Sequence, residues 1–390
     1  MKVGKAVYTN ALYVCVVSGL TTSSTDWQKD DGDNAYAVLT MNVPGANGKG
    51  VQENIGYFGT IYRNNAKIQS YLGVAQKFAG YYTMGLMGSN GGNGYLTMTI
   101  DNKGNAKIAG LLPDGTTKPS LSVKACGIRE DADSANGYVM YIPIFQAKSP
   151  YCFGGEIRLY ALRDEHAPDG SGMKIVVDEN WSFMEWYNDK DAFGCDFSGE
   201  TGFEEGLWTC GGWYDKVVNL QRYYLDYALS VGTEEISEFP YELLPGDDYS
   251  FVTAAQPDGF ALMFENDKIV HDKKKIVKTN RLTDFALSTN VCNVSVKFTR
   301  ATGVFTGGCS LWCEDGTKQK ELTGFKASGV FVLNRQPDDG ASCLPDSILA
   351  PGCLTKKNTF TLVDEETNRK TSVNWAFSLP FNIFGERMDR

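Results

Sequence analysis

Apolar and polar residues alternate most clearly in residues 78–115. Within 96–100 the sequence reads Leu-Thr-Met-Thr-Ile, and this period of two is typical of a strand with one buried face. Residues 101–104 are of types that accept the backbone angles of a tight turn, and residues 107–111 lead the chain back as the next strand. We therefore predict three antiparallel strands joined by two turns. Because a strand follows the glycines instead of a helix, the segment indicates architecture and not a phosphate-binding loop.

The same order of elements recurs at 294–333. Both segments read strand, glycine turn, strand, Asp-Gly-Thr turn and strand, with Gly104 and Gly303 in the first turn. The second turn consists of residues 114–116 in one segment and 315–317 in the other. A repeat of this kind indicates two related β units in one chain.

Short alternating segments cover most of the chain and predict an all-β fold of antiparallel β-sandwich or small-barrel domains. We divide the sequence into an N-terminal β domain (1–165), an irregular insert rich in aromatic and acidic residues (166–250) and a C-terminal β domain (251–390). Within the insert, the apolar spacing at 215–230 permits one helix, and a pair of strands is the alternative. The apolar run at 11–20 fits a strand or a signal peptide, and we favour the strand because no small-residue cleavage site follows.

The composition agrees with this class. The chain has 42 glycines and 12% aromatic residues, which suits many turns around β-sheet cores and argues against disorder. A net charge of −10 argues against nucleic acid as a partner, because phosphate binding needs clustered Lys and Arg. No run of 18 apolar residues is present, so we expect no membrane-spanning helix.

Ten cysteines are present and none forms a Cys-x-x-Cys pair. Cys195 with Cys210, and Cys343 with Cys353, lie close enough in sequence to close short disulfides. We predict an oxidising compartment, extracellular or at the cell surface, although the sequence does not determine how the cysteines pair.

Turn glycines and strand residues follow one another in a recurring order along residues 78–335. The positions are Phe78, Gly80, Tyr82, Thr83, Leu86, 94–97, Gly104, Gly110, 114–116, 139–145, Gly154, Gly155, Thr302, Gly303, Phe305, Gly307, Gly329 and Val330. This order resembles a β unit of large secreted or surface proteins of planctomycete, verrucomicrobial and lentisphaeral bacteria. The resemblance implies an extracellular, repetitive protein in an adhesive or coat-like assembly, and it supplies no catalytic residues. The chain departs from it in its cysteines and in the segment 165–250.

Histidine is nearly absent, since the chain contains only His166 and His271. Ser-His-Asp and Cys-His sites need a histidine base, and zinc sites need motifs that the chain lacks. The glycine-rich stretches at 45–50 and 88–94 lack the Gly-Lys-Ser/Thr sequence and the helix of a nucleotide-binding loop. The sequence therefore favours a protein without catalytic residues.

Aromatic and acidic residues are concentrated between 178 and 214. Sugars stack on aromatic faces while carboxylates accept hydrogen bonds from their hydroxyls, so this composition suits a glycan-binding groove. An aromatic core under an irregular loop is the alternative, and a third interpretation is a glycoside hydrolase that uses Glu185 with Asp189 or Asp191. The candidate ligand-binding residues are Trp181, Glu185, Trp186, Tyr187, Trp208, Trp213 and Tyr214.

Oxygen ligands that suit calcium are densest at Asp30, Asp31 and Asp33, which lack the spacing of an EF-hand; a plain acidic turn is the alternative. We expect no other cofactor.

The sequence thus predicts a non-enzymatic module of a secreted or cell-surface protein, with a structural or adhesive role. Its expected partner is a glycan or a surface protein, and strand edges also permit self-assembly. A carbohydrate-binding module is the alternative.

Overall fold

The structure is a computed structural model in which regular structure is almost entirely antiparallel β-strand, and this confirms the predicted all-β class. The α-helix of the described residues, α1 (Gln69–Ala75), continues into a short 3-10 helix (Gln76–Phe78). The described residues are 2–3, 6–7, 12–16, 36–44, 51–60, 67, 69–88, 92–148, 151–164, 172–188, 203–216, 223–228, 250–252, 262–265, 268–271, 295–315, 318–336, 348–363 and 370–387.

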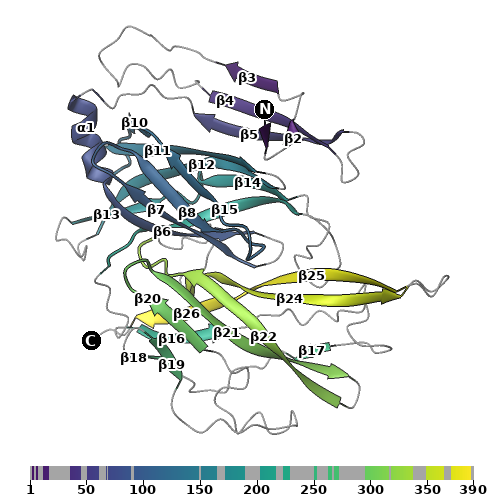
Figure 1. The fold of residues 1–390 in the computed structure, drawn as a ribbon. Helices are drawn as coiled ribbons and strands as arrows, with labels where there is room; N and C mark the ends of the chain where they lie inside the picture. Colours follow the sequence, from purple (N-terminus) through teal and green to yellow (C-terminus); the bar gives the residue numbers. More distant parts are fainter. Residues whose placement is uncertain are drawn as a thin grey trace.

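The first sheet has the strand order β10-β11-β12-β13-β15-β6-β7-β8-β9, and β14 pairs with both β12 and β15 (Figure 1). Its strands are β6 (Gly80–Met87), β7 (Gly94–Ile100), β8 (Ala106–Leu111), β9 (Ser120–Val123), β10 (Gly127–Glu130), β11 (Tyr138–Lys148), β12 (Tyr151–Arg163), β13 (Met173–Val177), β14 (Phe183–Asn188) and β15 (Phe203–Trp213).

The first sheet curls around one hydrophobic core, so that its end strand β9 meets β11, the strand next to the other end. Gln146 of β11 accepts a hydrogen bond from the backbone N–H of Ser120 in β9 at 3.2 Å and donates one to the Ser120 carbonyl at 3.1 Å. The core is formed by the inward residues of β6–β8 and of β11, β12 and β14. Helix α1 packs against this core, where the buried Tyr71 donates a hydrogen bond to the carbonyl of Cys126 at 2.6 Å.

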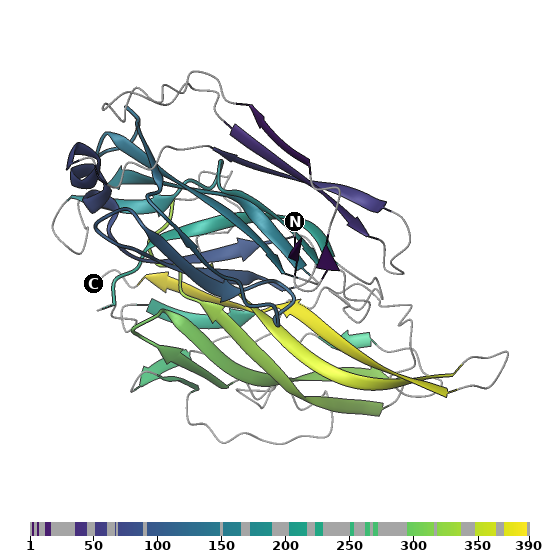
Figure 2. The same cartoon turned by 45° about the horizontal axis from the view of Figure 1, so that its top comes forward.

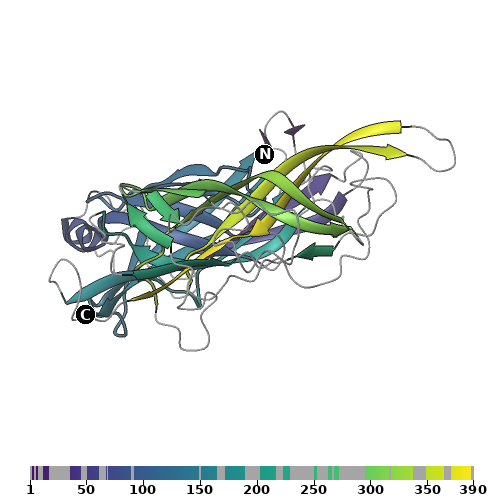
Figure 3. The ribbon, with the colours of Figure 1, turned by 90° about the horizontal axis from the view of Figure 1, so that it is seen from below.

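The second sheet has the order β23-β26-β16-β18-β19-β20-β21-β22-β24-β25, with β17 beside β21. The long hairpin of β24 and β25 extends beyond the rest of this sheet in Figures 1 and 3. The strands are β16 (Tyr223–Ala228), β17 (Ser250–Val252), β18 (Leu262–Glu265), β19 (Lys268–His271), β20 (Ser295–Thr299), β21 (Val304–Asp315), β22 (Lys318–Val330), β23 (Ile348–Ala350), β24 (Gly352–Val363), β25 (Lys370–Pro380) and β26 (Asn382–Arg387).

A smaller sheet of β3 (Leu12–Val16), β4 (Tyr36–Pro44) and β5 (Val51–Thr60) lies on the opposite side of the first sheet from the second one, so the molecule has three layers (Figure 2). Strands β1 (Lys2–Val3) and β2 (Ala6–Val7) pair with each other. The apolar run near the N-terminus therefore contains a strand, β3, as the sequence predicted.

The repeated units of the sequence have the same local structure. Strands β7, β8 and β9 form one antiparallel meander, and β20, β21 and β22 form the other. Gly104 and Gly303 lie in matching turns with φ of +72° and +69°, a region that favours glycine. The second pair of turns, at 114–116 and 315–317, cannot be compared in the same way, because residues 316 and 317 lie outside the described residues.

The segment 166–250 does not form the separate insert that the sequence predicted, because its strands belong to the two large sheets. Its strands β13, β14 and β15 belong to the first sheet, where β15 pairs with β6, and its strand β16 belongs to the second sheet. Strand β16 falls in the stretch for which one helix was an alternative. The pairing of β15 with a strand more than a hundred residues earlier is a long-range choice that no local pattern specifies.

The first and second sheets are joined by buried hydrogen bonds between residues far apart in sequence. The hydroxyl of Thr83 donates to the carbonyl of Phe331 at 2.6 Å, and the amide of Asn93 donates to Asn382 at 2.9 Å. An apolar cluster around Cys210 and Val330 fills part of the same interface. The sheets therefore pack as one body.

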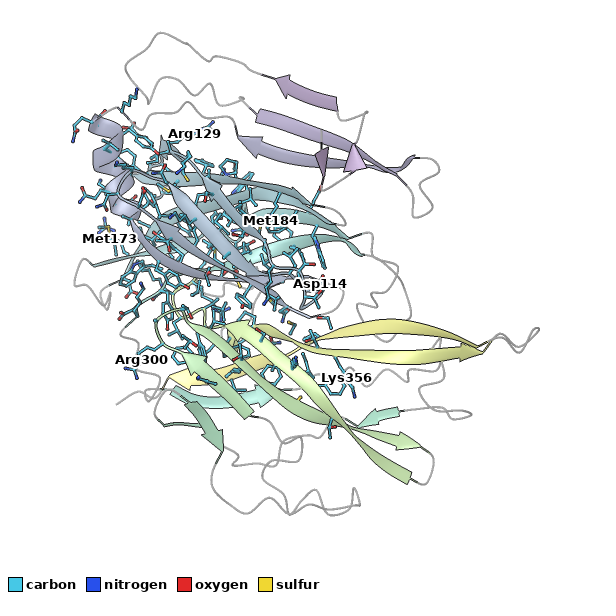
Figure 4. The ribbon with its side chains drawn as sticks, viewed as in Figure 1. Asp114, Arg129, Met173, Met184, Arg300 and Lys356 are labelled. Carbon is cyan, nitrogen blue, oxygen red and sulfur yellow. The ribbon has the colours of Figure 1, made fainter. Side chains whose placement is uncertain are left out.

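One turn of each repeated unit contacts the other sheet across this interface. Gly115 lies against Cys353 of β24. Gly303 lies against Thr83 of β6 and against Tyr214, which directly follows β15. Asp114 shapes the Gly115 turn, because its buried carboxylate accepts the backbone N–H of Thr117 at 2.6 Å. Figure 4 shows Asp114 on the side of the first sheet that faces β24. Each unit thus contributes one turn to the interface between the first and second sheets, which we call the joint.

Candidate functional site

The predicted aromatic and acidic cluster is divided between the two faces of the first sheet. In β14, Trp186 is 1% exposed and packs in the core with Met184, whereas Glu185 between them lies on the outer face. Trp208 of β15 is 44% exposed, and its cross-strand partners are Phe183 and Met87. Successive residues of a strand point to opposite faces. Trp186 is therefore a core residue and not a surface stacking platform.

Trp213 and Tyr214 hold structure together instead of facing solvent. Trp213 is partly buried against the core, and its indole covers Gly80. Tyr214 is 2% exposed, its hydroxyl donates to the carbonyl of Arg300 at 2.7 Å, and its ring meets Tyr81 edge-on. Burial raises the pKa of the Tyr214 hydroxyl. These two aromatic residues thus belong to the core and to the joint between the sheets.

Glu185 is half-buried on the outer face, and burial raises the pKa of its carboxyl group. A second carboxylate nearby would be needed for glycoside hydrolysis, and the candidates Asp189 and Asp191 lie outside the described residues. The side chain of Tyr187 also lies outside them. The hydrolase interpretation therefore stays a prediction.

Trp181 is the most exposed of the candidate residues, with 64% of its surface accessible. It lies in the turn between β13 and β14, where the backbone N–H groups of Trp181 and Ser182 both donate to the carbonyl of Asp178. The hydroxyl of Ser182 accepts the backbone N–H of Arg158 at 3.0 Å, so the turn is tied to β12. The turn thereby places Trp181 beside Arg158 of β12.

Trp181 is the outermost layer of a stack of aromatic and cationic side chains. The Arg158 guanidinium lies 4.7 Å from the centre of the Trp181 ring and 4.7 Å from that of Tyr141. Arg129 lies over Tyr141 at 5.3 Å. Because β10, β11 and β12 are neighbours, Arg129, Tyr141 and Arg158 share one face of the sheet. Each cation over an aromatic face contributes about 0.5–1 kcal/mol at exposed sites.

Asp178 anchors this stack. Its carboxylate lies 3.6 Å from the Arg158 guanidinium. Burial raises the pKa of the Asp178 carboxyl, and the opposing effect of Arg158 is smaller. The guanidinium is thus held between two rings and beside one carboxylate. Sequence reasoning missed Tyr141, Arg158 and Arg129 because they lie in separate strands, and only the register of those strands brings them together.

The calcium hypothesis concerns residues that the structure does not describe, since Asp30, Asp31 and Asp33 all lie outside its ranges. Within the described residues, no group of three or more His, Cys, Asp or Glu side chains is placed to hold a metal ion. No helix in the described ranges is long and apolar enough to cross a membrane.

No disulfide joins the four cysteines whose side chains are described, Cys126, Cys210, Cys309 and Cys353. Cys353 is a free thiol in the structure, so its expected disulfide with Cys343 is not formed, whereas Cys195 lies outside the described residues and its pairing with Cys210 stays a prediction.

We expect the thiols of Cys126 and Cys353 to resist alkylation in the folded protein. Burial raises the pKa of both to about 12, so very little reactive thiolate is present near pH 8. Iodoacetamide labelling followed by peptide mapping should modify both residues only after unfolding in guanidinium. Rapid labelling of the native protein, or recovery of Cys353 in a disulfide with Cys343, would contradict this expectation.

The chain matches no known protein family and no curated protein. Among solved structures, a provisionally assigned outer membrane protein from Bacteroides fragilis NCTC 9343 aligns over 81% of this chain and 99% of its own, with 11% identity and a TM-score of 0.16. A score of this size establishes neither a shared fold nor a shared location. The resemblance to bacterial surface proteins therefore stays a prediction from the sequence.

Proposed function

We propose that the protein is a non-enzymatic module of a secreted or cell-surface protein, with a structural or adhesive role. The observation that carries this proposal is the buried joint between the first and second sheets. Side chains such as Thr83 and Asn93, which a binding groove between the sheets would need to expose, are instead hydrogen-bonded across the joint. A joint of this kind makes a rigid support for exposed loops and strand edges.

The free edge of the second sheet suits assembly. Among the described strands, β25 pairs only with β24, and it is eleven residues long. An unpaired edge presents a row of backbone N–H and C=O groups that a strand of another chain can pair with. Self-assembly or adhesion to a surface protein through this edge is therefore part of the proposal.

The location is tested by antibody labelling of the cells that produce the protein. Antibodies raised against the recombinant chain should label intact cells or the culture medium, and brief protease treatment of intact cells should remove the cell-bound signal. Permeabilised cells provide the control for total protein. Labelling that requires permeabilisation would contradict a secreted or surface module.

A second candidate function is carbohydrate binding, which the exposure of Trp181 and Trp208 favours. These two indoles are the large apolar side chains exposed on the described surface. Exposed indoles often form the apolar platform of a binding site. The other rings of the predicted cluster whose side chains are described, Trp186, Trp213 and Tyr214, are wholly or partly buried and do not contribute.

A further inference from the structure

We propose that Trp181, Arg158 and Asp178 form a binding site for one pyranose unit of a neutral glycan. This inference rests on the second candidate function and gives it a location and a ligand class. Among the predicted aromatic residues it selects Trp181 in place of the buried Trp186 and Trp213, and it adds Arg158, which lies outside the predicted cluster.

The indole of Trp181 offers one open face. Arg158 lies over the ring at 4.7 Å, yet the residue is 64% exposed. The face opposite Arg158 is therefore directed to solvent. A flat apolar surface of this size matches the C–H face of a pyranose ring, which stacks on indole with little loss of hydration of the sugar hydroxyls.

Polar groups for the sugar hydroxyls lie beside the ring. Arg158 supplies N–H donors, and Asp178 supplies carboxylate oxygens as acceptors, at 3.6 Å from each other. Asn180, next to Trp181 in the turn, is exposed and offers both a donor and an acceptor. One apolar face with donors and acceptors at its edge is the arrangement that orients a polar ligand.

The site is formed before any ligand arrives. Arg158 is confined by Tyr141 on one side and Trp181 on the other, and the turn is tied to β12 through Ser182. Ordering a side chain on binding costs about 0.5–1.5 kcal/mol, and a side chain that is already ordered avoids this cost. The stack therefore favours binding even where only one ring makes the contact.

The charges favour a neutral ligand. Two cations, Arg129 and Arg158, are balanced by Asp178 and by the carboxylates of Asp131 and Glu156, which also act on Tyr141. The whole chain carries a net charge of −10. A polyanionic glycan would be repelled by this field, whereas a neutral one is not affected.

The test is a titration with cellohexaose, chitohexaose, maltohexaose and mannohexaose, followed by tryptophan fluorescence and calorimetry, with polygalacturonate as the anionic comparison. At least one neutral oligosaccharide should bind saturably and change the fluorescence. Trp181→Ala should weaken this binding at least about tenfold, equal to about 1.4 kcal/mol. Lys107→Ala, at an exposed position of β8 that contributes nothing to the site, should change the affinity by less than about threefold.

The variants must be folded for the comparison to count, so circular dichroism and melting curves accompany each titration. Trp181→Leu keeps an apolar side chain against Arg158 and lacks the ring, so it should also lose binding, which guards against a folding defect in Trp181→Ala. Unchanged affinity in both Trp181 variants would overturn the site and leave carbohydrate binding standing. Binding of none of the neutral glycans, or of polygalacturonate alone, would overturn the inference and the second candidate function. The cell-labelling experiment tests the surface module independently of either result.

Discussion

Gly115→Ala is expected to lower the free energy of unfolding by about 2–5 kcal/mol. Gly115 has φ +63°, and an L-residue in this region costs about 1–2 kcal/mol. An added Cβ would also overlap Cγ2 of Thr355 and lie 3.2 Å from Sγ of Cys353, which is fully buried. Overpacking of a filled site costs typically about 1–3 kcal/mol. The substitution therefore strains the turn and separates the two sheets at the same point.

Gly137→Ala is the matched control for this prediction. Gly137 has a similar φ of +78°, but a Cβ there would meet nothing within 4 Å. The free energy of unfolding of Gly137→Ala should fall only by the cost of a left-handed backbone conformation, about 1–2 kcal/mol. Urea unfolding followed by circular dichroism gives both values, and equal losses in the two variants would show that the contact between the Gly115 turn and β24 does not stabilise the protein.

Trp186→Ala is expected to cost about 3–5 kcal/mol, the usual range for removal of a buried aromatic residue. The side chain is 1% exposed and lies in the core of the first sheet between β12 and β15. The cavity left by an indole is too large for the surrounding strands to close. A measurable fraction of this variant should therefore be unfolded at room temperature.

Trp181→Ala, five positions earlier, should cost less than about 1 kcal/mol, since it loses one cation–π contact at an exposed position. The comparison is made by guanidinium unfolding of both variants beside the wild type. A small loss in Trp186→Ala would contradict its place in the core and would indicate that β14 is paired one residue out of this register, with its two faces exchanged.

Local pattern predicted a good part of the fold. Leu96, Met98 and Ile100 are buried in β7 while Thr99 is exposed, as the alternation required. The glycine turns at 104 and 303 have the positive φ that their residue types suggest. These features depend on the backbone preferences of neighbouring residues, which the sequence contains directly.

The candidate site was predicted less well. A concentration of tryptophans and carboxylates in the sequence suggested one groove. Neighbouring residues of a strand point to opposite faces, however, and Trp186 and Glu185 therefore lie on opposite faces of β14. Which face becomes the core depends on pairing with β12 and β15, and no residue within β14 specifies that choice.

The sequence by itself determined the all-β class, the two meanders and the residue types of their turns, because alternation and turn chemistry act over a few residues. The tertiary structure alone decided that β15 joins β6, that the turns at Gly115 and Gly303 form the joint, and that Arg129, Tyr141, Arg158 and Trp181 form one stack. Those contacts join residues tens to hundreds of positions apart. Their free energy comes from burial and strand register, which are properties of the whole sheet and not of any segment.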